Sequence, residues 1–422
     1  MSKIDVLSTI HVNTAVEGTV GSRVWMISWN FNGSLLASCG DDKTVRIWKK
    51  VKSSPYLECC TKIDDSHSKA VRCVEFSHCE MSKIDVLSTI HVNTAVEGTV
   101  GSRVWMISWN FNGSLLASCG DDKTVRIWKK VKSSPYLECC TKIDDSHSKA
   151  VRCVEFSHCG RHLASASFDA SVVVYSREEG EFSESDKLEG HESEVKWCSF
   201  SPSDEFLATC SRDRSVWFWQ MDEDEEFQVS SVLQSHTQDV KFVAWHPHEE
   251  LLVSCSYDSC IIFYRFDGDD WITQQKICEA HYGTVWCAAF DSDGHRLVTV
   301  GEDHVVNLWK RDSPEGPAVT DKWRSIAKLF VEDTELPLYT ISWHKITGLI
   351  ASGGGDGIIR IFRVEGSEDD EHIIQTISMD TNANEINCVA WNPTTTSEDN
   401  TDSWMLASCS DDGTIRLFGV SL

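Results

Sequence analysis

Histidine and aspartate recur together along this chain, accompanied by serine or threonine, and these are the residue types of a nucleophilic catalytic triad. The histidines of four such groups are His147, His191, His236 and His281, and the aspartates that follow them are Asp169, Asp213, Asp258 and Asp303. Because these residues recur within a repeated unit, we interpret them as structural. The chain also lacks a phosphate loop and a nucleophile elbow, and we expect no enzymatic activity.

The 18 cysteines are the second group that could do chemistry, because thiolates bind zinc and iron–sulfur clusters. Their spacing does not suit either site: Cys59–Cys60 and Cys139–Cys140 are adjacent pairs, and no C-x₂-C run occurs. Cys210, Cys255 and Cys409 occupy equivalent positions in separate repeats, which is typical of buried packing. We therefore expect reduced cysteines, no resident metal and no cofactor.

A repeated unit positions these residues. In each unit an apolar residue is followed after five residues by an aromatic one, thirteen later by Asp, and six later by another aromatic, except that the seventh unit has eight extra residues between Trp391 and Asp412. Beyond residue 80, the seven units carry Asp122, Asp169, Asp213, Asp258, Asp303, Asp356 and Asp412. Short alternating stretches such as VKWCSF and turn-forming clusters such as SRDR predict four strands per unit. Seven such units predict an all-β fold, a seven-bladed β-propeller.

The unit resembles the WD40 family, with His before the innermost strand, Asp between the second and third strands, and Trp near the end of the third. This resemblance implies that the Asp accepts hydrogen bonds from the His and from turn amides, while a hydroxyl and the Trp indole complete the network. In the third unit these residues are His191, Thr209, Asp213 and Trp219. A buried carboxylate needs such partners, since its desolvation is costly.

Residues 1–79 and 81–159 are identical. We interpret residues 1–80 as a duplicated blade-and-a-half, arising from recent duplication or a gene-model error. Residues 81–422 would form the complete propeller. Its last unit lacks an outer strand, and the segment 84–91 would pair with that unit to close the ring. An eight-bladed ring is the less favoured alternative, because it would have to absorb half a blade.

Three positions in each unit are expected around the top opening of the propeller: the two neighbours of the first apolar residue, and the residue before the Asp. The candidate partner-binding residues at these positions are Arg103, Trp105, Arg152, Phe168, Lys196, Arg212, Lys241, Tyr257, Trp286 and Tyr339. Arg and exposed aromatic side chains are common anchors of interfaces. We hypothesise that this face binds a short acidic segment with an apolar or aromatic anchor.

The overall charge limits the classes of partner. Acidic residues number 65 and basic ones 39, a net charge of −26, which argues against nucleic acid and anionic membranes. The sequence has no apolar run long enough to span a bilayer and begins without the features of a secretory signal. We expect a cytoplasmic protein, with the nucleus as a second location.

Several stretches, including LEGHESEVK (188–196), LATCSRDRSVWFW (207–219) and CVAWNP (388–393), resemble the WD40 subunits of the cytosolic iron–sulfur protein assembly (CIA) targeting complex. The resemblance implies a non-catalytic scaffold that helps to deliver clusters to cytosolic and nuclear apoproteins. It also implies three partners: a small targeting subunit, a HEAT-repeat adaptor and an iron-only-hydrogenase-like protein. Some relatives carry a Leu-Tyr-Arg tripeptide read by a co-chaperone, where this chain has Phe263-Tyr264-Arg265. A generic WD40 adaptor of ubiquitination, transcription or trafficking is the alternative.

Overall fold

The computed structural model describes residues 24–29, 35–41, 43–50, 57–63, 83–92, 102–131, 137–312, 322–367, 370–394 and 403–421. These residues form β-strands joined by turns, and the chain separates into two compact units, Met1–Met81 and Ser82–Leu422. Within the described ranges, no helix is long and apolar enough to cross a lipid bilayer.

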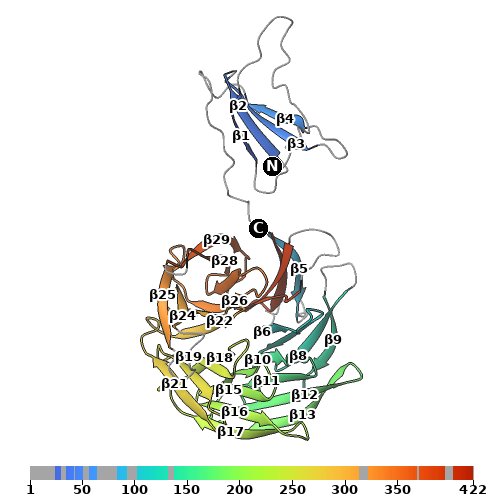
Figure 1. The fold of residues 1–422 in the computed structure, drawn as a ribbon. Coiled ribbons are helices and arrows are strands. Elements are labelled where there is room, and N and C mark those ends of the chain that lie inside the picture. The colour runs from blue at the N-terminus through green and yellow to red at the C-terminus, as the bar shows by residue number, and fades with distance from the viewer. Residues whose placement is uncertain are drawn as a thin grey trace, which may run out of the picture. The chain divides into compact units, whose positions relative to one another are not determined.

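Seven four-stranded antiparallel sheets form the larger unit and confirm the predicted seven-bladed β-propeller (Figure 1). We number these sheets as blades 1 to 7 and name the strands of each blade a to d, from the centre outward. The a strands are β6 (Val104–Trp109), β10 (Val151–Phe156), β14 (Val195–Phe200), β18 (Val240–Trp245), β22 (Val285–Phe290), β26 (Leu338–Trp343) and β30 (Ile386–Trp391). The b strands are β7 (Leu115–Gly120), β11 (His162–Ser167), β15 (Phe206–Ser211), β19 (Leu251–Ser256), β23 (Arg296–Gly301), β27 (Ile350–Gly354) and β31 (Ser403–Ser410).

The two outer strands of each blade complete the sheets. The c strands are β8 (Val125–Lys130), β12 (Ser171–Glu178), β16 (Val216–Met221), β20 (Ile261–Phe266), β24 (Val305–Arg311), β28 (Ile358–Glu365) and β32 (Thr414–Ser421). The d strands are β9 (Leu137–Ile143), β13 (Glu181–Glu189), β17 (Phe227–Leu233), β21 (Trp271–Ile277), β25 (Trp323–Phe330), β29 (His372–Asp380) and, in blade 7, β5 (Lys83–His91).

Blade 7 therefore takes its outer strand from the start of the unit. β5 pairs antiparallel with β32, from Thr414 opposite His91 to Ser421 opposite Lys83. The backbone N–H of Val92 extends this pairing by donating to the carbonyl of Gly413 at 3.1 Å. This strand pairing ties the two ends of the unit into a single sheet.

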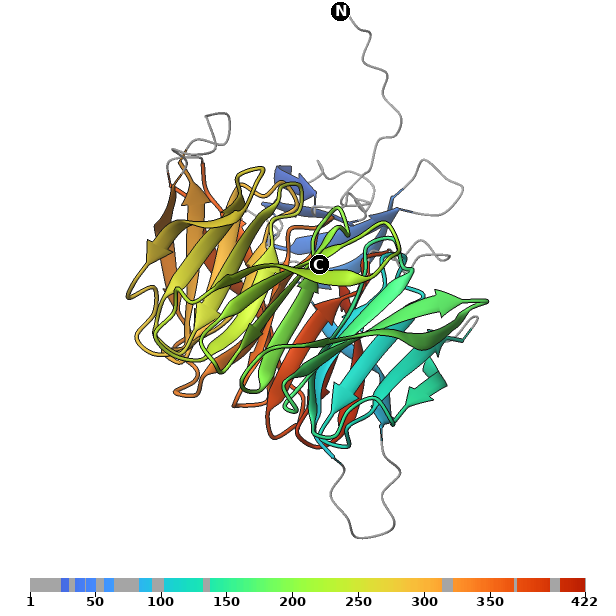
Figure 2. The same ribbon diagram turned by 90° about the horizontal axis from the view of Figure 1, so that it is seen from below.

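The core lies between neighbouring blades, where apolar side chains of the inner strands meet. The b strands are the most buried: Leu116, Leu163, Leu207 and Leu252 are fully inaccessible to solvent. Neighbouring strands are antiparallel, so the d–a and b–c connections of every blade lie on one face of the ring, here called the top face (Figure 2). The a–b and c–d connections lie on the opposite, bottom face.

The smaller unit contains one four-stranded sheet of β1 (Val24–Trp29), β2 (Leu35–Gly40), β3 (Val45–Lys50) and β4 (Leu57–Ile63). Its local bonding matches that of the identical sequence in blade 1: Trp48 Nε1 donates to Ser38 Oγ at 2.8 Å, and Trp128 Nε1 donates to Ser118 Oγ at 2.8 Å. The side chain of Ile27 is nevertheless 59% exposed, against 1% for its counterpart Ile107. The predicted further half blade, residues 71–80, lies outside the described residues.

Candidate partner-binding face

The predicted His–Asp network forms in blades 2 to 5 and supports the top-face connections. In blade 3, His191 Nδ1 lies 2.8 Å from an Asp213 oxygen, and its Nε2 lies 2.8 Å from Thr209 Oγ1. Trp219 Nε1 donates to the same Thr209 hydroxyl at 3.0 Å. The backbone N–H of Glu192 also donates to Asp213, at 3.0 Å. In blade 3 these hydrogen bonds therefore connect the d–a connection to strands b and c, which is a structural role.

The other three groups repeat this arrangement. The His–Asp distances are 3.3 Å for His147 and Asp169, 3.0 Å for His236 and Asp258, and 2.8 Å for His281 and Asp303. In blade 3, burial raises the pKa of Asp213, but hydrogen bonds from His191 and Ser215 outweigh burial and hold the pKa well below its usual range. The aspartate is therefore kept ionised, and its oxygens are occupied by hydrogen bonds from His191 and the turn.

Blades 1, 6 and 7 use a different partner that the sequence analysis did not identify. Each replaces the His with an Arg four residues after the Asp: Arg126 donates to Asp122, Arg360 to Asp356 and Arg416 to Asp412, each at 2.6 Å. The signal was present in the sequence, because these three units lack the His and share an Arg at this position of strand c. An Arg charge compensates the buried carboxylate as the His does elsewhere.

A β-bulge places the second residue of each a strand at the top opening. The register between strands a and b shifts after the first residue of strand a in all seven blades, for example between Val195 and Trp197. The residue left unpaired in each bulge is the expected surface position, which includes Trp105, Arg152, Lys196, Lys241, Trp286 and Tyr339 of the candidate set. The bulge, and not strand alternation alone, therefore sets this position.

Cations and aromatic rings from different blades meet at this opening. The guanidinium carbon of Arg152 lies 5.0 Å from the Trp105 ring centroid and 6.0 Å from that of Trp197. Lys196 Nζ lies 4.2 Å from the Phe168 centroid. Further contacts join Arg103 to Trp105 at 5.5 Å, Lys241 to Tyr257 at 5.3 Å and to Trp286 at 5.4 Å, and the rings of Trp286 and Tyr339 at 5.2 Å. Nine of the ten candidate residues thus fall in two clusters of contacts that include cation–π pairs. One cluster spans blades 1 to 3, where the ring centroids of Trp105 and Phe168 lie 6.4 Å apart, and the other spans blades 4 to 6.

The tenth candidate, Arg212, lies outside both clusters. Its Nη1 donates to Glu194 at 3.1 Å, and its side chain remains 58% exposed. Arg103 pairs with Asp411 at 3.1 Å, and Lys241 pairs with Asp239 at 3.3 Å. The Arg212 and Arg103 side chains are 58% and 50% exposed, and exposed pairs of this kind contribute little to stability, so these two cations remain available to an acidic ligand. The Lys241 side chain is only 16% exposed.

Arg152 is the least satisfied of these cations. Its Nη1 atom is buried and has no hydrogen-bond partner among the described residues. Buried polar atoms in native proteins usually have a partner, and an orphan therefore requires an explanation. A ligand oxygen entering the top opening would supply one.

Three further apolar side chains extend the top face beside blades 5 and 6. Tyr282 is 83% exposed, Phe330 57% and Leu336 47%, and all lie at or next to d–a connections. The sequence analysis missed them because they fall outside the three positions that it considered in each blade. The signal in the sequence would have been a large apolar residue in the segment before strand a, such as Tyr282 directly after His281.

The tripeptide Phe263-Tyr264-Arg265 lies in a different environment. It forms part of strand β20, where Phe263 and Tyr264 are fully buried and Tyr264 hydroxyl lies 3.3 Å from Ser254 Oγ. Arg265 pairs with Glu249 at 3.2 Å. These three side chains serve the packing of blade 4 and are poorly placed to contact a partner.

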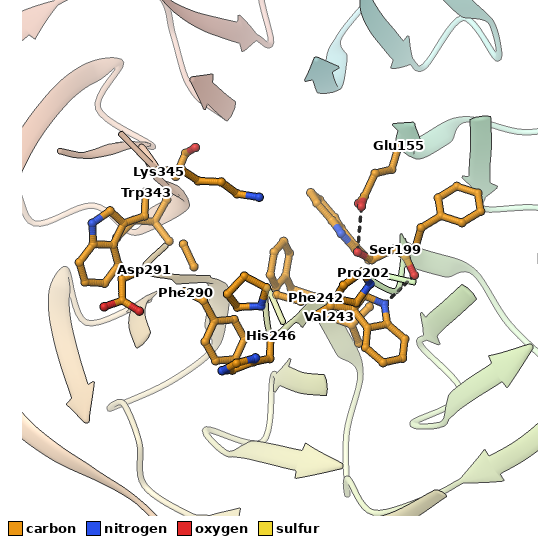
Figure 3. A pocket seen from close by; sticks show the side chains of 18 of the residues that line it. Glu155, Ser199, Pro202, Phe242, Val243, His246, Phe290, Asp291, Trp343 and Lys345 are labelled. Carbon is orange, nitrogen blue, oxygen red and sulfur yellow. Dashed lines mark hydrogen bonds between the residues drawn. The ribbon is translucent and has the colours of Figure 1, made fainter. Parts of the chain in front are cut away.

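A concave site lies at the bottom mouth of the central channel. Two adjoining cavities of about 330 and 530 Å³ share walls from Glu155, Trp197, Phe242 and Lys345. Figure 3 shows Glu155 accepting a hydrogen bond from Ser199, at 2.9 Å, and Lys345 reaching into the opening from blade 6. Burial raises the pKa of Glu155 to about 7. Asp291 supplies a second carboxylate to the lining, and burial raises its pKa as well.

The cysteines of the described ranges do not gather into a metal site. No group of three or more His, Cys, Asp or Glu side chains that could hold a metal ion occurs there. Burial raises the pKa of the Cys119, Cys210 and Cys255 thiols well above the usual value. Metals bind the thiolate, so this environment disfavours ligation.

Comparison with known proteins places this fold in a family. The WD domain, G-beta repeat family matches at residues 12–49, 92–129, 138–176, 182–220, 227–265, 272–310 and 373–418. The probable cytosolic iron-sulfur protein assembly protein CIAO1 homolog of Caenorhabditis elegans is 58% identical over 325 residues, which cover 76% of this chain and 95% of the relative. The probable cytosolic iron-sulfur protein assembly protein Ciao1 of Culex quinquefasciatus is 41% identical over 326 residues, covering 75% and 94%.

Both relatives align over nearly their whole length, and six of the seven repeat matches fall within the propeller unit. The chain therefore belongs to the WD40-repeat family and, within it, to the cytosolic iron–sulfur protein assembly proteins.

Proposed function

We propose that this protein is a non-catalytic scaffold of cytosolic iron–sulfur protein assembly and that its top face holds a partner protein. The relatives are named for this process, and the propeller offers rigid faces rather than a reaction site. The expected partners are those of the CIA targeting complex: the small targeting subunit, the HEAT-repeat adaptor, the iron-only-hydrogenase-like protein and the apoprotein clients. The expected location is the cytoplasm, with the nucleus as a second site.

The observation that carries the top-face assignment is the environment of Arg152. Its guanidinium carbon lies 5.0 Å from the ring centroid of Trp105 and 6.0 Å from that of Trp197, and its buried Nη1 has no hydrogen-bond partner in the described part of the chain. A carboxylate can accept from a guanidinium in a charge-assisted hydrogen bond, and the neighbouring rings offer apolar surface to an anchor side chain. The proposed ligand is therefore an acidic segment with one apolar or aromatic residue.

Peptide binding tests this assignment. The probe is a fluorescein-labelled Asp-Glu-Asp-Leu-Glu-Asp peptide, and its affinity is measured by fluorescence anisotropy. Arg152→Glu and Arg212→Glu should each weaken binding at least tenfold. Arg161→Glu is the matched control, because Arg161 is exposed in the a–b connection of the bottom face and pairs with Glu225 at 2.9 Å. Unchanged affinity for both top-face variants would refute the assignment.

Affinity purification of the wild-type chain tests the process. We expect the assembly partners in the eluate and their loss from the Arg152→Glu variant. Recovery of ubiquitin-ligase, transcription or trafficking subunits in their place would support the generic adaptor.

We also propose that residues 81–422 make the functional propeller and that residues 1–80 are dispensable. The closing strand β5 belongs to the second copy, and the larger compact unit begins at Ser82. A chain lacking residues 1–80 should unfold at the same denaturant concentration as the propeller of the full chain. A lower midpoint would show that the first copy stabilises the ring.

A further inference from the structure

Within the described residues, the outer strand of each blade pairs with strand c of its own blade and with no second strand, which leaves its other edge unpaired by a strand. An unpaired edge can accept a strand from another chain, and natural proteins often block it with charged side chains, especially Lys. The seven d strands of this propeller differ in how well they are blocked.

The strand registers allow the same position to be compared in every blade. In blade 3, Val232 lies opposite Trp217, four residues after the structural Asp. The residue at this place is Lys142 in blade 1, Lys187 in blade 2, Lys276 in blade 4 and Lys328 in blade 5, and it is Ser378 or Thr89 in blades 6 and 7. Blade 3 is thus the one blade whose blocking position is apolar.

The rest of β17 carries no charge of its own, and carboxylates of neighbouring blades contact it at two points. Asp186 accepts from the backbone N–H of Phe227 at 3.0 Å, and Asp270 accepts from the Ser231 hydroxyl. The sequence of β17, FQVSSVL, has no charged residue, whereas each of the other six d strands has at least one. The side chains of Val229 and Val232 are 50% and 44% exposed. β17 lies on the outer rim of the ring, away from the central opening (Figure 1).

An acidic turn, Asp222–Glu226, leads directly into this strand. Asp222 accepts hydrogen bonds from the backbone of Asp224 and Glu226, which orders the turn. Glu225 pairs with Arg161, while Glu223, Asp224 and Glu226 have no ion pair within the described part of the chain. A hollow of about 460 Å³, lined by Met221, Asp222, Gln228 and Val229 among others, lies where turn and strand meet.

We propose that β17 is a docking edge for an extended segment of a partner protein, which adds a fifth strand to blade 3. The segment carries β-branched side chains over Val229 and Val232, and Lys or Arg at the end that meets the acidic turn. A second copy of this chain fits poorly, because each copy carries a net charge of −26 and β17 lacks a basic residue. This site is separate from the top face and does not depend on its assignment.

The test measures peptide binding to the full chain by fluorescence anisotropy. The probe is the fluorescein-labelled peptide Thr-Val-Thr-Val-Thr-Val-Lys-Arg, with a second peptide ending in Gln-Gln for comparison. Val232→Lys introduces the side chain that four other blades have at this position and should weaken peptide binding at least tenfold. Val86→Lys is the matched control: Val86 is a 48% exposed valine on β5, and its replacement should change affinity less than twofold.

Hydrogen–deuterium exchange locates the bound peptide, and protection should be confined to β17. The Gln-Gln peptide should bind more weakly and lose the dependence on salt that the basic end confers. Absence of binding to the wild-type chain, or equal binding to the Val232→Lys variant, would overturn the proposal. A wild-type dimer in sedimentation that dissociates on Val232→Lys would also overturn it, in favour of pairing between copies.

Discussion

The guanidinium carbon of Arg152 lies 5.0 Å from the ring centroid of Trp105, and the two residues belong to neighbouring blades. Each occupies the bulge position of its a strand, so the contact joins the mouths of blades 1 and 2. The indole Nε1 of Trp105 also donates to Asp121 at 2.6 Å, which fixes the ring against the turn between β7 and β8. The Arg side chain is thereby presented in one orientation.

Replacement of Trp105 by Leu should therefore weaken acidic peptide binding although Trp105 carries no charge. We expect a loss of about 1–2 kcal/mol, because the cation–π contact is partly shielded from water. Phe111→Leu serves as the control, since Phe111 is an exposed aromatic residue of the bottom face. A double-mutant cycle with Arg152→Gln should show that the two losses are not additive. Additive losses would mean that the two side chains act independently.

Arg360 provides a prediction on stability. Its side chain is fully buried, and Nη2 contacts Asp356 at 2.6 Å and Asp333 at 2.9 Å. Arg360→Met would leave both carboxylates without this partner and should lower the free energy of unfolding by about 3 kcal/mol. Urea denaturation followed by tryptophan fluorescence measures the change.

The control for Arg360 lies on the same strand. Arg363 is 53% exposed and pairs with Glu365, so Arg363→Met should change the free energy of unfolding by less than about 0.5 kcal/mol. If both variants lost equal stability, the effect would come from the strand and not from the buried ion pair.

The fold followed from the sequence because the spacing of the repeat is set locally. An apolar residue, an aromatic residue, an Asp and a second aromatic residue recur in order along each unit, and seven such units determine the number of blades. The Arg–Asp pairs of blades 1, 6 and 7 were missed because only His was considered as the partner of the Asp. An Arg on strand c can also compensate the charge of this carboxylate. Arg126 and Arg416 were nevertheless visible as the third residue of the stretches TVRIW and TIRLF.

The contacts between blades could not be derived in this way. The distance from Lys196 to Phe168 depends on the angle between blades 2 and 3 and on the bulges in their a strands. The unprotected edge at Val232 required the register of each c–d pair, because bulges in the d strands shift the sequence alignment by one residue. Relationships across separate sheets appear only once the ring is assembled.

Glu155 gives a prediction on pH. Burial raises its pKa to about 7 in the folded protein, from an ordinary value near 4.5. The folded state therefore holds a proton that the unfolded state has lost, and stability should fall as the pH rises from about 4.5 to about 7. Glu155→Gln removes this loss and should be more stable than wild type by about 1–3 kcal/mol at pH 8.

Ser199 offers a companion to that experiment. Its hydroxyl donates to Glu155 at 2.9 Å and lowers the pKa of the carboxyl group against the effect of burial. Ser199→Ala should shift the fall in stability to higher pH. Identical pH profiles for wild type and Glu155→Gln would exclude Glu155 as the origin of the pH dependence.

Iron content tests the role of the cysteines. Because burial keeps the thiols of Cys119, Cys210 and Cys255 protonated, protein purified without oxygen should contain far less than one iron and one sulfide per chain. Colorimetric iron and sulfide assays measure this. A stoichiometric cluster would show that the protein carries the cluster itself and does not act only as a scaffold.

Lys196 connects the top face to pH. Burial, aided by the nearby Lys241 and Arg152 charges, lowers the pKa of its ammonium group to about 8. An acidic ligand binds the charged form, so affinity for the acidic peptide should fall as the pH rises from 7 through 8 to 9.5. Lys196→Arg keeps its charge throughout this range and should bind with little change. If wild-type affinity stayed constant to pH 9.5 while Lys196→Arg bound equally well, Lys196 would not contact the acidic ligand.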